Sequence, residues 1–160
     1  MNIIDYVSET YSDREFIFIK GHLYLEGIMS ELIKKLYPNP NSLNNIDNSF
    51  FKKVKLIRAV NGITDEMEKL LLEVNSIRNK MAHNLHYKLS FDDFFELVLL
   101  SVNAHIDYSD DGIFKDKEYS KKEYFENSNF GVQELMSNTF SKLVDNENMF
   151  SISEISSFLC

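Results

Sequence analysis

The chain has 160 residues, of which 44% are hydrophobic and 13% aromatic, and its formal net charge is −8. This length and composition predict one soluble domain over residues 1–160 with a single buried core. Only 5 glycines and 2 prolines argue against an all-β chain, and the lone cysteine excludes an intramolecular disulfide, as suits a reducing compartment. No signal-peptide pattern opens the chain and no apolar run is long enough to cross a bilayer, so we expect a cytoplasmic protein without a membrane partner.

The negative charge is unevenly distributed. Residues 1–60 carry 8 basic and 7 acidic side chains, whereas residues 101–160 carry 5 basic and 11 acidic ones. The overall acidity argues against a nucleic-acid partner, because nucleic acids are polyanions. A local basic run argues the other way and comprises Lys52, Lys53, Lys55 and Arg58. These side chains either bind RNA phosphates or form a solvated helix face.

A long amphipathic pattern predicts the first helix over residues 13–37. Its apolar residues recur near the 3.6-residue period, and Ser12 or Asp13 is a suitable N-cap. Pro38 and Pro40 end this helix, because a residue before proline avoids the α region. A polar loop rich in asparagine follows.

Two further helices are predicted after this loop. The first runs from about Ser49 to Asn61, and Gly62 is expected to stop it. The second starts after Thr64, whose hydroxyl suits an N-cap. Its apolar residues keep the helical period down to Met81.

Ser90 is expected to open a fourth helix that ends near His105. Asp93 follows three residues later, so the pair forms a capping-box pattern with the shorter acid. Aromatic and aliphatic residues then supply one apolar face.

The last third of the chain carries weaker patterns. We expect an acidic connector over residues 107–118, then a helical stretch over 121–144 that a glycine interrupts, and a short helix over 151–159. No alternating strand pattern of useful length occurs. The sequence therefore predicts an all-α bundle with a core of four helices over about residues 13–106 and additional helices in an acidic extension over about 107–160.

One cluster stands out for chemistry, because Arg78, Asn79 and His83 lie within six residues near the end of the third predicted helix. Arginine holds an oxyanion in a fork of donors, histidine transfers a proton near neutral pH, and asparagine can orient either. Asn79 and His83 share a helix face, whereas Arg78 and His83 lie about 140° apart around the axis. Either the helix loosens at residues 82–84, or two copies face each other across a symmetric interface.

Purely structural roles are open for the same three residues. Arg78 could pair with Glu73 or with a carboxylate on a neighbouring helix. His83 could cap the last carbonyls of its helix, and Asn79 could be a buried amide that fixes helix pairing.

The segment Arg78-Asn79-Lys80-Met81-Ala82-His83 resembles the R-N-x-x-x-H motif of the HEPN superfamily of small helical-bundle proteins. Residues 21–26, Gly-His-Leu-Tyr-Leu-Glu, look like the first helix of its mannitol-operon repressor branch, and residues 51–60 are similar to that branch's second helix. The resemblance covers about residues 14–105 and implies an all-α, HEPN-like antiparallel four-helix bundle with additional C-terminal helices.

Many HEPN proteins are metal-independent ribonucleases that act as dimeric toxins or antiviral effectors. The resemblance implies that His83 is the general base or acid, that Arg78 stabilises the transition state, and that Asn79 positions one of them or the phosphate. Lys80 is a candidate phosphate contact. One toxin branch carries a tyrosine two residues after the histidine, where this chain has Leu85.

Other HEPN-like proteins do not cleave RNA, so the resemblance also allows a non-catalytic transcription regulator or interaction module with a protein partner, such as an antitoxin. His22 and Glu26 lie four apart on the first predicted helix, where they could form a local pair or support the motif. The histidine spacing matches no zinc signature, and no phosphate loop or nucleophile elbow occurs, so we expect neither a metal nor a cofactor.

Overall fold

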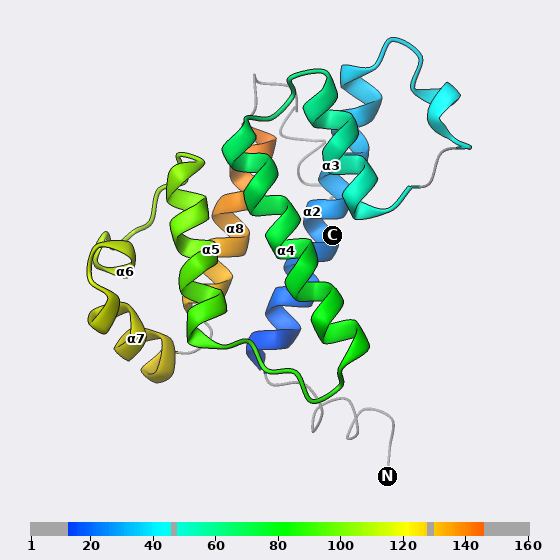
Figure 1. The fold of residues 1–160 in the computed structure, drawn as a ribbon. Coiled ribbons are helices and arrows are strands. Elements are labelled where there is room, and N and C mark those ends of the chain that lie inside the picture. The colour runs from blue at the N-terminus through cyan, green and yellow to red at the C-terminus, as the bar shows by residue number, and fades with distance from the viewer. Residues whose placement is uncertain (1–12, 46–47, 128–129, 146–160) are drawn as a thin grey trace.

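The computed structural model describes residues 13–45, 48–127 and 130–145. Within these ranges every regular element is helical, which confirms the all-α prediction (Figure 1). Seven α-helices, α2 to α8, and one 3-10 helix, η1 (Pro40–Leu43), account for the described elements. The predicted helix over residues 151–159 lies outside the described residues.

The first helix, α2 (Asp13–Leu36), follows its sequence pattern closely. Its buried residues recur every three to four positions, from Phe18 through Leu25 to Leu32, and face the centre of the bundle. After η1, the chain reverses to the start of α3 (Phe50–Ala59), where the Ser49 hydroxyl accepts a hydrogen bond from the Lys52 amide.

Helix α3 ends at Ala59, two residues before the predicted Asn61, and the left-handed residue after it lies one position earlier than predicted. Asn61, not Gly62, takes the left-handed conformation, with φ 56°. The Asn61 amide bonds the Arg58 carbonyl and the Gly62 amide bonds the Ile57 carbonyl, which is a Schellman motif with asparagine in the glycine position. Gly62 is required for space instead, because an added Cβ would lie 2.6 Å from Leu36 Cδ1.

The caps of the next two helices are confirmed. α4 (Asp65–His83) begins after Thr64, whose Oγ1 accepts a hydrogen bond from the Met67 amide. α5 (Phe91–Asn103) begins after Ser90, whose Oγ accepts from the Asp93 amide at 3.0 Å. The two helices pack side by side and antiparallel, joined by the turn at one end of the molecule (Figure 1).

The C-terminal third contains more helix than the sequence indicated. The expected connector over residues 107–118 includes α6 (Gly112–Lys115), and α7 (Lys117–Glu126) begins inside it after an Asp116 cap. The break falls before α8 (Phe130–Val144) rather than at Gly131, which lies inside that helix.

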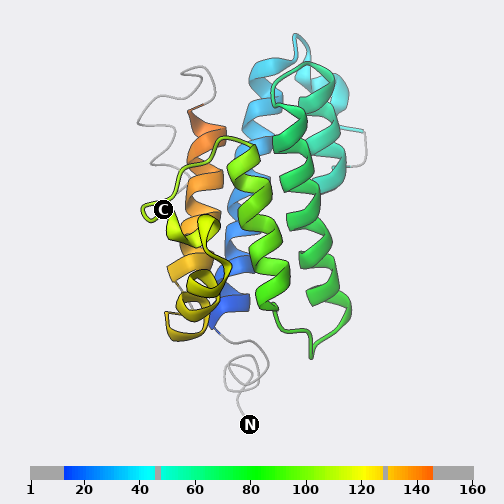
Figure 2. The same cartoon turned by 60° about the vertical axis from the view of Figure 1, so that its left-hand side comes forward.

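Helix α8 belongs to the bundle rather than to an extension. It packs along α2 and against α5, and its side chains Val132, Leu135 and Leu143 are buried in the common core (Figure 2). The expected division of the chain near residue 106 is therefore corrected. The long apolar α2 needs this partner, because α3 is too short to cover it.

The helix directions also correct the predicted antiparallel bundle. α3 runs parallel to α2, since Glu26 pairs with Lys53 and, further along both helices, Leu36 lies against Gly62. α8 runs parallel to α2 as well. Gly21 lies against Met136, and one turn further along both helices Tyr24 lies against Phe140. Among the described bundle helices α2, α3, α4, α5 and α8, only α4 runs opposite to α2 (Figure 1).

Among the described helices, none combines the length and the apolar character that crossing a bilayer requires.

Two glycines of α2 provide a matched test of the α2–α8 contact. A Cβ at Gly21 would lie 2.7–2.9 Å from three side-chain atoms of Met136, whereas a Cβ at Gly27 would meet nothing within 4 Å. We expect Gly21→Ala to lower the free energy of unfolding by about 1–3 kcal/mol through overpacking. Gly27→Ala should raise it by about 0.5–1 kcal/mol, because alanine loses less backbone entropy. Urea unfolding measures both, and a stabilised Gly21→Ala protein would show that α8 does not pack there.

Candidate functional site

The Arg-Asn-His cluster lies on the last two turns of α4. The helix stays regular through His83, and only Asn84 leaves it, with extended backbone angles. Of the two alternatives, a loosened helix at residues 82–84 is therefore not observed at residues 82 and 83, which remain helical. Arg78 and His83 of one chain consequently remain about 140° apart around the axis.

A groove between α3 and α4 collects two of the three motif residues. Its volume is about 580 Å³. Asn79 and His83 line it together, as their four-residue spacing predicted, and Arg78 does not. The remaining lining residues are Phe51, Leu72, Asn75, Ser76 and Lys80.

Arg78 does not line the groove, but it lies near enough to the buried His22 of α2 for its charge to act on that ring. Its side chain is half-buried, and its Nη1 donates a long hydrogen bond of 3.4 Å to Asn79 Oδ1. No ion pair joins Arg78 to Glu73 or to any other carboxylate within the described residues. Asn79 is exposed rather than buried between helices, and it connects Arg78 to the groove.

His83 is exposed at the open end of the groove and makes no hydrogen bond to another described residue. It does not cap the helix, since the Lys80 carbonyl accepts from the Asn84 amide at 3.0 Å. The imidazole is therefore available to a bound molecule.

His22 and Glu26 do not form the expected local pair, because each bonds a different helix. His22 is buried; its Nε2 lies 3.2 Å from Asn75 Oδ1 of α4, and its ring stacks on Phe50 of α3 with centroids 4.2 Å apart. Glu26 accepts a hydrogen bond of 3.0 Å from the buried Lys53 ammonium of α3. The two residues join α2 to both neighbours behind the groove.

Burial lowers the pKa of His22 below 6.5, and the nearby cations Arg78 and Lys53 act in the same direction. The Asn75 hydrogen bond and Glu26 oppose this shift without reversing it. A neutral His22 satisfies the contact when its Nε2–H donates to Asn75 Oδ1, which fixes the tautomer and the amide orientation together.

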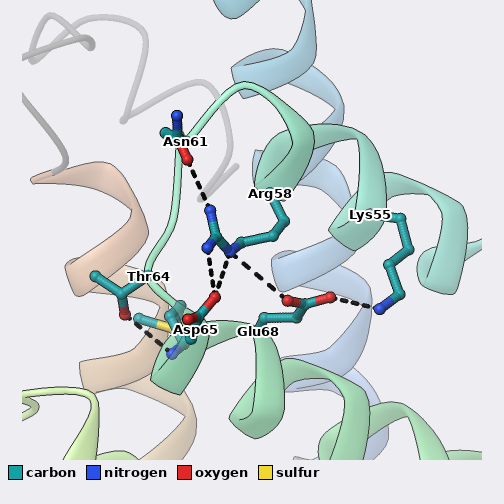
Figure 3. A network of polar contacts seen from close by, with 7 residues as sticks. Lys55, Arg58, Asn61, Thr64, Asp65 and Glu68 are labelled. Carbon is teal, nitrogen blue, oxygen red and sulfur yellow. Dashed lines mark hydrogen bonds and ion pairs between the residues drawn. The ribbon is translucent and has the colours of Figure 1, made fainter.

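Three of the four residues in the predicted basic run are neutralised by acidic partners. Lys55 Nζ lies 2.5 Å from Glu68 Oε1, and Arg58 Nε donates to Asp65 Oδ1 at 2.7 Å and lies 3.7 Å from Glu68 (Figure 3). Lys53 forms an ion pair with Glu26, as described above. Among the described residues, only Lys52 of this run has no ion-pair partner. These contacts hold α3 against α2 and α4. RNA binding by the run stays a prediction, and the pairing of its cations with carboxylates argues against it.

Lys80 extends toward α5 and lies 3.9 Å from Asp93 while remaining half-exposed. A surface pair of this length contributes little, so the ammonium can turn to another anion.

Sequence reasoning missed Phe51, Asn75 and Ser76 as groove residues. Asn75 could have been found, because it precedes Asn79 by one turn and so shares its face. Phe51 could not, since only the position of α3 against α4 brings its ring to the groove. Within the ranges 13–45, 48–127 and 130–145, no three His, Cys, Asp or Glu side chains converge as metal ligands would.

The lowered pKa of His22 predicts a stability change with pH. The unfolded chain binds a proton near pH 6.5, whereas the folded chain binds it only at lower pH. The contribution of neutral His22 is thus complete above pH 6.5 and is lost as the pH falls below it. We expect His22→Gln, which cannot titrate, to show a smaller loss of unfolding free energy between pH 7.5 and 5.5. Equal losses in both proteins, measured by urea unfolding, would contradict the assignment.

Comparisons of the chain with protein-family models, with curated proteins and with solved structures find no significant match. The geometry of the groove and the motif residues themselves are therefore the basis for a functional proposal.

Proposed function

We propose that the protein is a HEPN-type, metal-independent endoribonuclease that cleaves RNA at its Arg78-Asn79-His83 site, as a toxin or an antiviral-defence effector. The observation that carries the proposal is that Asn79 and His83 share one open groove, with Arg78 bonded to Asn79 beside it. A histidine without a structural partner can transfer the protons of phosphodiester cleavage without metal, and a guanidinium and an amide can stabilise and orient the phosphoryl group.

The proposed active form is a homodimer. Regular helix through His83 keeps Arg78 of the same chain on another side of α4. Two α4 helices that face each other across a two-fold axis would bring both sets of motif residues to one shared groove.

The chemistry needs only proton transfers and charge stabilisation. One His83 accepts the proton of a ribose 2′-hydroxyl, whose oxygen forms a bond to phosphorus. The bond from phosphorus to the 5′-oxygen breaks, and this oxygen takes a proton from the imidazolium of the other copy. Arg78 stabilises the charge on the phosphoryl oxygens. The products are a 2′,3′-cyclic phosphate and a 5′-hydroxyl.

Further residues would support the site either by contacting RNA directly or by positioning other residues. Lys80, and Lys52 from the basic run, would contact flanking phosphates, because neither is held by a close ion pair among the described residues. His22 and Glu26 would act indirectly, through Asn75 and through the position of α3.

A second candidate is a non-catalytic HEPN-like regulator or interaction module. The net charge of −8 and the neutralised basic run favour it, because a surface with few free cations attracts a polyanion weakly. A basic protein would be the matching partner.

Cleavage in excess EDTA tests the proposal. We expect the wild type to cut total tRNA or mixed mRNA and to leave cyclic-phosphate ends. His83→Ala should lower the rate by about 10²-fold or more, because it removes the proton-transfer group. His86→Ala is the matched control, since His86 is also exposed and lies outside the groove. Absence of cleavage by all three proteins, with folding intact by circular dichroism, would favour the regulator.

Dilution of the protein tests whether two chains are needed to form the shared groove. We expect activity per mole of protein to fall as the concentration passes below the dimer dissociation constant, because one chain cannot complete the site. Sedimentation equilibrium gives that constant independently. Constant specific activity across the monomer–dimer transition would show that a single chain is sufficient.

A further inference from the structure

Phe51 is an aromatic side chain that the fold leaves on the surface. It is 45% exposed and lines the groove that also holds Asn79 and His83. The neighbouring Phe50 is 4% exposed and packs on His22, so the two rings of this pair have different surroundings. Phe51 contributes to the wall of the groove while much of its side chain stays exposed.

Asn75 is presented to the same groove in a fixed orientation. Its Oδ1 is bonded to the buried His22, and no described residue accepts a hydrogen bond from its amide N–H groups, which leaves them for a molecule bound in the groove. Ser76 and Asn79 add a hydroxyl and a second amide on the same side of α4. The groove therefore combines one flat apolar surface with several neutral donors and acceptors.

Ion pairs limit the groove at the end away from His83. One helical turn before Leu72, Glu68 bonds Lys55 and lies near Arg58, and these contacts tie α3 to α4 (Figure 3). The Lys55 ammonium also lies 5.5 Å from the centre of the Phe51 ring. The ring is thus held between a charged network and the open groove that leads to His83.

We propose that this groove is a nucleobase subsite in which one base of a single-stranded RNA stacks on Phe51 and accepts a hydrogen bond from the Asn75 amide. The inference deepens the proposed function and rests on it for the substrate class. Stacking on aromatic side chains with hydrogen bonds to unpaired base edges is how proteins hold single strands. The lining is largely apolar with a few amide and hydroxyl groups, which suits a nucleobase, because a base has flat apolar faces and a polar edge.

The subsite also lies within reach of His83 along the same helix. Asn75 and His83 are eight residues apart on α4, or about 12 Å along the axis. A base held at Phe51 and Asn75 therefore places a nearby phosphate of the same strand at His83. The binding energy comes from the base, which is consistent with a basic run already occupied by ion pairs.

Fluorescence of 2-aminopurine in a short single-stranded RNA tests the subsite, because stacking on an aromatic ring quenches it. The His83→Ala protein is used so that the RNA stays intact. We expect saturable quenching, a dissociation constant about tenfold higher for Phe51→Leu in the same background, and recovery of affinity and quenching in Phe51→Tyr. Phe125→Leu is the matched control, since Phe125 is 63% exposed on α7 and outside the groove.

The outcomes separate this inference from the proposed function. Equal quenching and affinity for Phe51→Leu and Phe125→Leu, or no binding by the parent protein, would overturn the subsite. If the protein with His83 intact cleaves RNA while Phe51→Leu leaves KM unchanged, the nuclease proposal stands and the subsite fails. If the protein binds with quenching that depends on Phe51 but never cleaves, the subsite stands and the nuclease proposal fails.

Discussion

The buried ion pair between Glu26 and Lys53 is the contact on which the arrangement of α2, α3 and α4 depends. The Lys53 side chain is only 7% exposed, so its ammonium must keep a partner. The pair fixes where α3 lies along α2, and the His22–Asn75 hydrogen bond fixes α4 at the same level. Together they place the start of α3 against the second half of α4. The groove exists because these two polar contacts set that register.

The same register decides which carboxylates the basic side chains of α3 meet. Three cations of α3 meet carboxylates from α2 and α4, which leaves Lys80 as the only Lys or Arg side chain among the described residues that line the groove. A nuclease built this way would recognise bases more than phosphates, and its affinity would depend weakly on salt. The charge network and the groove are therefore two results of one helix pairing.

Helix positions could be predicted well where a local signal was strong. Thr64 and Ser90 cap α4 and α5 as expected, because a cap needs only the hydroxyl and the next three residues. Predictions failed where contacts between residues far apart in the sequence determine the structure. Asn61 takes the left-handed position because Gly62 is needed for close approach to Leu36, and α8 joins the bundle because α2 is longer than α3. The direction of α3 depends on the path of the loop after α2, which periodicity does not report.

The sequence by itself determined that this is a helical protein in which Asn79 and His83 share one face of a helix and Arg78 lies on another. These relations follow from backbone hydrogen bonds and a fixed rotation per residue, which are local. Only the tertiary structure decided that Phe51 and Asn75 join that face, that His22 and Glu26 serve different helices, and that the basic run is paired. Those facts depend on which side chains meet across helices, and such contacts are set by the packing of the whole core.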